Sequence, residues 1–210
     1  MNEFDIKAPQ WDNNQMHRDR SAAIVKELIS RIPVSRKMRA LEYGAGTGIT
    51  SFLMKDLLKE ITMMDSSIEM VRVMEQKIIA EGADNLKALF FDLEKEEWTG
   101  EKFDLVMTQM VLHHVIDLDN ILVKFRNIIA PGGYLAIADL YPEDGSFHGN
   151  DFTGHKGFDV EDLSEKIRNL GFSNIKHRKC FVINKMITDN VVKHYDVFLL
   201  TGELVNTGSY

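Results

Sequence analysis

The sequence has little of three things that would point to particular classes of protein. Its 210 residues contain a single cysteine, Cys180, which excludes an internal disulfide or a thiolate metal cluster and suits a reducing compartment. No apolar run approaches the ~20 residues that a membrane-spanning helix needs. Positive charge is not in excess, and the formal net charge of −7 argues against a broad nucleic-acid-binding surface. We therefore expect a cytoplasmic protein with no membrane span and no nucleic-acid partner.

The length and the N-terminus favour one domain without a secretory leader. A hydrophobic fraction of 44% is enough for a substantial core, and residues 1–5 are polar and acidic. We expect a single domain over residues 1–210. Residues 1–20 would form an N-terminal arm or lid, flexible over residues 1–14, and residues 141–157 would form a long loop rich in Gly, His and Asp.

Short apolar segments alternate with helical patterns along most of the chain. Two further strands, near Ile175–Ile183 and Val192–Leu200, are expected to form a hairpin with its turn at 184–190. The alternation predicts a doubly wound α/β sheet of seven strands, five parallel plus a C-terminal antiparallel β-hairpin. The five parallel strands are expected at residues 38–43, 61–65, 86–91, 103–108 and 134–139.

Several polar residues mark where the helices between these strands begin. Apolar residues at helical spacing predict a first helix from Ser21 to Ile32. Ser66 and Glu69 form a capping-box pattern for a later helix. Asp117 and Asp159 are placed to cap two more.

The segment from Ala40 to Gly48 carries the strongest functional signal. It places a strand ending near Glu42 before three alternating glycines, Gly44, Gly46 and Gly48, and an amphipathic segment. A strand, a glycine turn and a helix N-terminus together form a cradle for a nucleotide-like ligand. The dinucleotide pattern G-x-G-x-x-G does not fit, because the third glycine comes only two residues after the second.

Three of the first four predicted strands present a carboxylate at their ends, from Glu42, Asp65 and Asp92. Ligands of such sheets bind beyond the carboxyl ends of the strands, so these side chains should face one crevice. Three carboxylates suit a ligand rich in hydrogen-bond donors and positive charge, and they oppose the two phosphates of a dinucleotide. An NAD-dependent oxidoreductase is therefore a remote alternative.

These features resemble the class I S-adenosylmethionine (SAM) dependent methyltransferases. The resemblance covers roughly residues 37–140 and includes the turn at Pro131–Gly133. It also includes the segment Leu112–Val115, which is common in methyltransferases of the ubiquinone/menaquinone-biosynthesis type, the type 11/25 group. The resemblance implies a Rossmann-like fold with a C-terminal hairpin and S-adenosyl-L-methionine as the cofactor.

The resemblance also implies roles for individual residues. Asp65 would bind the ribose hydroxyls and Asp92 the adenine amine, with Leu93 against the ring. Gln109 would face the methyl group. Trp11 either closes over the cofactor as part of a lid or anchors the first helix. The expected cofactor-binding set is Glu42, Gly44, Ala45, Gly46, Gly48, Asp65, Ser66, Met70, Asp92, Leu93, Gln109 and Trp11.

Histidines are the candidates for acid–base chemistry. Methyl transfer from a sulfonium needs mainly alignment and exclusion of water, but a poor nucleophile such as a hydroxyl or an acidic carbon needs a base. His155, His148 and His113 are the candidates. His113 and His114 are not expected to face one cleft together, because neighbours in a helix point ~100° apart. No metal site is expected, since neither an i,i+4 pair nor a thiolate accompanies His148 and His155.

The sequence thus predicts an enzyme that transfers a methyl group from SAM to a small-molecule acceptor by in-line displacement. Residues 1–20 and 141–157 would line the acceptor side, where Arg18 and Arg20 either meet a substrate carboxylate or are solvated. The alternative is a protein that binds SAM or S-adenosylhomocysteine without turnover. The sequence predicts neither the identity of the acceptor nor the oligomeric state.

Overall fold

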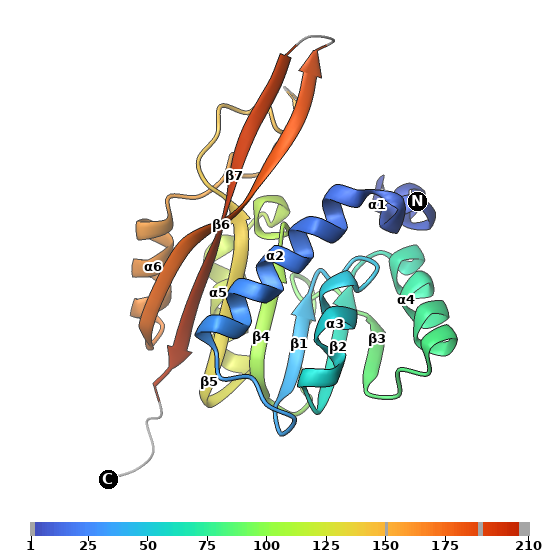
Figure 1. Cartoon of the computed structure of the whole chain (residues 1–210). Helices are drawn as coiled ribbons and strands as arrows, with labels where there is room; N and C mark the ends of the chain where they lie inside the picture. The colour runs from blue at the N-terminus through green and yellow to red at the C-terminus, as the bar shows by residue number, and fades with distance from the viewer. Residues whose placement is uncertain (1–2, 150, 189–190, 206–210) are drawn as a thin grey trace.

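Seven strands form one mixed sheet in this computed structural model, which describes residues 3–149, 151–188 and 191–205 (Figure 1). The strand order is β3-β2-β1-β4-β5-β7-β6. β1 to β5 run parallel, and β7 pairs antiparallel with both β5 and β6, which confirms the predicted fold class. The strands are β1 Arg39–Tyr43, β2 Glu60–Asp65, β3 Leu86–Phe90, β4 Phe103–Gln109, β5 Ile129–Leu140, β6 Phe172–Thr188 and β7 Val191–Leu204.

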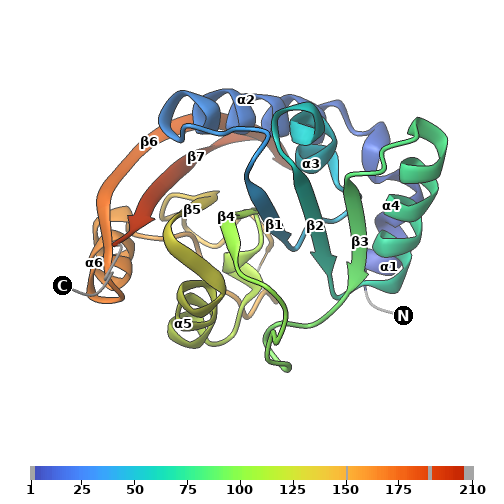
Figure 2. The ribbon, with the colours of Figure 1, turned by 90° about the horizontal axis from the view of Figure 1, so that it is seen from below.

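Helices cover both faces of this sheet (Figure 2). α2, α3 and α4 pack on one face, and α5 and α6 on the other, so that two separate hydrophobic clusters form. The α-helices are α1 Glu3–Lys7, α2 Gln15–Arg31, α3 Ile49–Met54, α4 Ile68–Glu81, α5 Leu118–Ile128 and α6 Val160–Asn169; the 3₁₀ helices are η1 Ala8–Asn13, η2 Lys55–Leu57 and η3 Leu112–His114.

Side-chain caps define where several helices begin. Asp117 and Asp159 each accept backbone N–H groups at the starts of α5 and α6, as predicted. Two expected starts were wrong. Ser67 rather than Ser66 caps α4, because its hydroxyl accepts the N–H of Met70. α2 begins at Gln15 instead of Ser21, because the side chain of Asn14 caps a first turn that lacks apolar periodicity.

The C-terminal hairpin is longer than predicted. Residues 184–188 belong to β6 and pair with residues 191–194 of β7, whereas the sequence pattern placed a turn over 184–190; residues 189–190 lie outside the described chain. The side chains of this extension are mostly exposed, so no buried apolar face signalled a strand. The extension rises beyond the edge where the parallel strands end (Figure 1).

The direction of the strand order changes between β1 and β4. In doubly wound sheets the crevice at this switch, beyond the carboxyl ends of the strands, binds ligands. The loops after β1, β2, β3, β4 and β5 therefore define the candidate site. Within the described ranges, no helix combines the length and the apolar character that crossing a membrane requires.

Candidate functional site

The loop between β1 and α3 needs its glycines for two reasons. Gly44, Gly46 and Gly48 take φ angles of +67°, +57° and +79°, a region that side chains rarely adopt. A Cβ on Gly44 would lie 2.4 Å from the side chain of Val111, so packing leaves no room for a side chain at this position. A Cβ on Gly46 would instead meet only the indole nitrogen of Trp11, at 3.8 Å. The backbone of Gly46 can therefore be approached closely from the side that faces Trp11.

Glu42 lies at the base of this loop and is fully buried. Its Oε2 accepts the backbone N–H of Ser51 at 3.1 Å and the hydroxyl of Ser51, so the carboxylate braces the first turn of α3. Burial raises the pKa of Glu42 to about 7. Its other oxygen, Oε1, is enclosed without a hydrogen-bond partner. A buried acceptor of this kind suits a donor brought by a ligand or a water.

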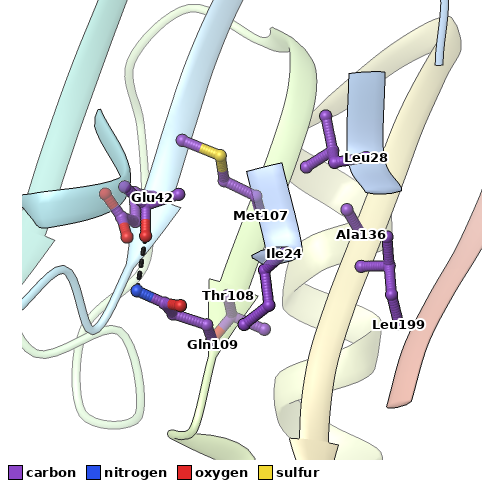
Figure 3. Close-up of a pocket in the computed structure, with 9 residues that line it drawn as sticks. Ile24, Leu28, Glu42, Met107, Thr108, Gln109, Ala136 and Leu199 are labelled. Atoms are coloured by element: carbon purple, nitrogen blue, oxygen red, sulfur yellow. Dashed lines mark hydrogen bonds between the residues drawn. The ribbon is translucent and has the colours of Figure 1, made fainter. Parts of the chain in front are cut away.

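Gln109 ends β4 and shares a small cavity with Glu42 (Figure 3). Its amide nitrogen donates to the hydroxyl of Ser21 at 2.9 Å and to that of Thr50. The side chain therefore ties β4 to α2 and α3. The next residue, Met110, has a φ of +55°, which is uncommon outside glycine and turns the chain sharply as it leaves β4.

Asp65 joins the glycine loop to the start of α4. Its Oδ2 accepts the N–H of Gly46 at 2.7 Å, and its Oδ1 accepts the N–H of Ser67 at 2.8 Å. The pKa of Asp65 is raised to about 6, mainly by burial and in part by the charge of Asp5. Asp5 belongs to α1 and accepts the hydroxyl of Ser67 at 2.6 Å. The carboxylate of Asp65 is thus held at the mouth of the loop by backbone donors.

The residues expected around the adenine differ in exposure. Asp92, after β3, is half-buried and forms an ion pair with Lys95 at 2.7 Å. Leu93 is fully buried in the cluster beneath α5. Met70 is also buried, whereas Ser66 is exposed. Of this group, Asp92 and Ser66 keep polar atoms within reach of solvent.

The three carboxylates lie at or just after the ends of the neighbouring strands β1, β2 and β3. The charge of Asp65 contributes to the raised pKa of Glu42. The charges of Asp92 and Asp65 both contribute to the raised pKa of Tyr43, whose main cause is burial. Tyr43 is the last residue of β1. A shared ligand site for the three carboxylates stays a prediction of the sequence.

The N-terminal segment lies across the glycine loop. Asp12 in η1 accepts the hydroxyl of Thr47 and pairs with Lys77 of α4 at 2.7 Å, and Lys77 also donates to the carbonyl of Thr47 at 2.8 Å. Trp11 stacks on His17 with ring centroids 4.2 Å apart. Residues 3–13 are thus helical and tied to the loop, rather than the flexible arm expected for residues 1–14.

A buried histidine–aspartate pair lies on the other side of the crevice. The Nδ1 of His113, in η3, is 2.6 Å from Oδ1 of Asp139 near the end of β5. The backbone N–H of Leu140 also donates to this oxygen, at 2.7 Å. Asp139 is fully enclosed and His113 nearly so. With Nδ1 directed at the carboxylate, Nε2 is the ring nitrogen of His113 that remains for another partner.

His114 and His148 complete a cluster around His113. The centroid of the His148 ring is 5.0 Å from each of the other two rings, so the expectation that adjacent histidines cannot face one place was wrong. A single 3₁₀ turn replaces the α-helix on which that expectation rested. Burial lowers the pKa of both His114 and His148 to about 4, which keeps these rings neutral at pH 7. Phe152 stacks on His148 at 4.0 Å.

His155 lies apart from this cluster. Its Nε2 donates to the carbonyl of Val115 at 3.0 Å, and its backbone N–H donates to the carbonyl of His113 at 2.8 Å. Its ring packs against Phe158. These contacts fix the end of the 141–157 loop onto η3.

Sequence reasoning missed Asp139 as a functional residue. The signal was present, because Asp139 is an acidic residue at the end of a predicted strand, like Glu42, Asp65 and Asp92. Its partner is 26 residues away in the chain, so no local motif joined the two. Asp12 was also missed, since its partners Thr47 and Lys77 come from distant segments.

The chain is similar to known methyltransferases in sequence and in fold. A family model described as a methyltransferase domain matches residues 34–168. An uncharacterized methyltransferase from Schizosaccharomyces pombe is 28% identical over 153 residues, which are 65% of this chain and 54% of that protein. The chain thus spans about half the length of this curated relative.

Solved structures resemble the fold closely at low identity. The YcgJ protein of Bacillus subtilis superposes with a TM-score of 0.72 at 15% identity, over 87% of this chain and 98% of that one. Phosphoethanolamine N-methyltransferase 2 of Haemonchus contortus, solved with S-adenosyl-L-methionine, superposes with a TM-score of 0.69 at 15% identity, over 89% of this chain and 52% of that one.

Proposed function

Because the chain belongs to the class I SAM-dependent methyltransferases, we propose that it transfers the methyl group of SAM to a small-molecule acceptor by in-line displacement. The observation that carries the proposal is the unobstructed backbone of Gly46, where only the indole nitrogen of Trp11 lies within 4 Å of an added Cβ and where Asp65 accepts the backbone N–H. A ligand there meets a glycine loop on one side and an aromatic ring on the other.

The donor set of SAM fits the acceptors that this chain supplies. SAM carries a methyl group activated by a sulfonium, together with an ammonium group, ribose hydroxyls and an adenine amine. The unpartnered Oε1 of Glu42 can accept from the ammonium group directly or through a water. Asp65 would accept from the ribose hydroxyls and Asp92 from the adenine amine. The segment around Trp11 would exclude water from the reacting centre.

A base is needed when the acceptor atom is a hydroxyl or an acidic carbon. Of the three histidines that the sequence offered, the geometry favours His113, because Asp139 fixes its Nδ1–H and leaves Nε2 free to take a proton. His155 uses its Nε2 on a backbone carbonyl. His148 lies beside His113 and would line the acceptor crevice. Asp139 would act as a positioning residue that sets the tautomer.

The test combines a SAM titration with a methyl-transfer assay. We expect SAM to bind in calorimetry and labelled methyl to appear on at least one member of a panel of hydroxyl, acidic-carbon and amine compounds. With an acceptor that needs a base, His113→Gln should lower kcat by roughly 10²–10⁴-fold. His155→Gln is the matched control and should retain most activity. SAM binding without any methylated product would favour the non-catalytic alternative, and absence of SAM binding would contradict the proposal.

A further inference from the structure

Arg20 is a buried cation whose donors are almost unused. It lies on α2 with only 6% of its surface exposed. Its Nη1 contacts the sulfur of Met16 at 3.8 Å, and its Nε is enclosed with no partner. In the described part of the chain, no carboxylate or carbonyl accepts a hydrogen bond from this guanidinium. Burial lowers the pKa of Arg20 only to about 10, so the group is charged at neutral pH.

A guanidinium offers five N–H donors, and burying one without acceptors is unfavourable. The charge of Asp139 offsets part of this cost, since it raises the pKa of Arg20. The carboxylate of Asp139 is already hydrogen-bonded to the ring of His113 and to the backbone N–H of Leu140. Arg20 therefore feels the charge of the carboxylate that holds the candidate base, yet it has no hydrogen-bond acceptor of its own except the sulfur of Met16.

The neighbouring arginine on the same helix is different. Arg18 is exposed, and its guanidinium donates to the carbonyl of Asp12 and to the side chain of Gln15. Ser21, next to Arg20, bonds to Gln109 at the end of β4, which places this turn of α2 against the crevice. Of the two arginines, only Arg20 combines burial with free donors at the crevice.

We propose that Arg20 binds an oxyanion group, a carboxylate or a phosphate, carried by a ligand of this crevice. The fork of a guanidinium matches both groups with two parallel hydrogen bonds. This inference rests on the proposed function, because it takes the crevice as the place where SAM and the acceptor meet. The oxyanion has two possible sources, namely the methyl acceptor and the amino-acid carboxylate of SAM itself.

The first arm of the test compares two nucleosides in wild-type protein, Arg20→Met and Arg18→Met. S-adenosylhomocysteine has the amino-acid carboxylate, and 5′-methylthioadenosine lacks it. If the carboxylate of SAM is the partner, Arg20→Met should weaken S-adenosylhomocysteine binding at least tenfold and leave 5′-methylthioadenosine binding unchanged. Arg18→Met should bind both nucleosides like the wild type.

The second arm measures thermal unfolding with S-adenosylhomocysteine present, in phosphate, in succinate and in sodium chloride of equal ionic strength. If the acceptor supplies the oxyanion, phosphate or succinate should raise the Tm of wild type and of Arg18→Met by about 2–4 °C more than chloride does. Arg20→Met should show no such difference. The anion that acts identifies whether the group is a phosphate or a carboxylate.

The ligand-free proteins supply a further check. Burying the guanidinium without hydrogen-bond acceptors costs more than its attraction to Asp139 returns, so Arg20→Met should unfold at the same temperature as the wild type or higher. A Tm well below that of Arg18→Met would reveal a structural role and overturn the proposal, as would responses of Arg20→Met identical to wild type in both arms. If the wild-type protein bound neither nucleoside, the proposed function itself would fail.

Discussion

The two halves of the crevice are built in different ways. In the half proposed to bind the cofactor, called the cofactor half and formed by β1, β2, β3 and the glycine loop, Asp65 and Glu42 accept backbone N–H groups. Asp65 accepts from Gly46 and Ser67, which lie 19 and 2 residues away, and Glu42 accepts from Ser51, 9 residues away. Because the donors are backbone N–H groups, these hydrogen bonds depend on the backbone conformation and not on which side chain the donor residue carries.

The acceptor half, formed by β5, the hairpin of β6 and β7, and the 141–157 loop, depends on pairs of side chains from distant segments. The ring of His113 meets Asp139, 26 residues away. The hydroxyl of Ser146 lies 2.7 Å from that of Tyr195, 49 residues along the chain, and Lys193 pairs with Asp144 across the same separation. Each contact here needs two particular residues and the completed fold.

On the proposed function, this difference would allow cofactor binding and acceptor use to vary separately. The backbone donors of the cofactor half are present whatever the side chains are, although Asp12 adds side-chain contacts to Thr47 and Lys77 from a distant segment. In the acceptor half, exchanging one side chain removes a contact and reshapes the crevice. Changes in the two halves should therefore be separable, with cofactor affinity following one half and acceptor use the other.

The largest effect is expected at the glycine loop, where one substitution should abolish SAM binding. Replacing Gly46 with Val places methyl groups in the space that opens toward Trp11, so SAM binding should be lost. Gly82 is a matched control, since it also has a positive φ of +58° but nothing lies within 4 Å of an added Cβ. Gly82→Val should carry a similar backbone strain and still bind SAM in calorimetry. Normal SAM binding by Gly46→Val would show that the cofactor does not lie against the backbone of Gly46.

The same division decides what the sequence could predict. The positions of the five parallel strands, the glycine loop and the caps at Asp117 and Asp159 followed from local patterns, because each feature is specified within a few residues. The three strand-end carboxylates followed from the topology of the sheet.

The acceptor half gave no comparable local signal. The contact of His113 with Asp139 and the convergence of His114 and His148 appear only once η3 packs against β5 and the long loop. The extension of the hairpin over residues 184–188 was missed because its hydrogen-bond ladder has no buried apolar face. The early start of α2 was missed because a side-chain cap, not periodicity, specifies its first turn.

Replacing Asp65 with Asn should have an intermediate effect confined to the cofactor half. Loss of charge-assisted hydrogen bonds should weaken SAM binding by about 1–3 kcal/mol. The pKa of Asp65 is raised to about 6 in the ligand-free protein, and the ionised form is the better acceptor. Wild-type affinity should therefore fall as the pH drops below 6, by up to about tenfold per pH unit from Asp65 alone. Asp65→Asn should lose this part of the fall and keep only the part that comes from Glu42, whose pKa is about 7.

Asp139→Asn is the control for this pH dependence, because it removes a buried carboxylate from the acceptor half. Its SAM affinity should match that of the wild type, and the weakening of SAM binding below pH 6 should persist. Calorimetry at several pH values measures both. A wild-type affinity that is flat between pH 5 and 8 would show that Asp65 does not contact the cofactor.

The smallest expected effect comes from the hairpin. Tyr195 is buried, and its hydroxyl meets that of Ser146, which links β7 to the long loop. Tyr195→Phe and Ser146→Ala should each cost about 1 kcal/mol of unfolding free energy, and the double variant should cost less than the sum, because both remove the same hydrogen bond. SAM affinity should be unchanged in all three variants while the KM for the acceptor rises. If SAM affinity fell together with stability, the two halves would be coupled through the hairpin and could not be varied independently.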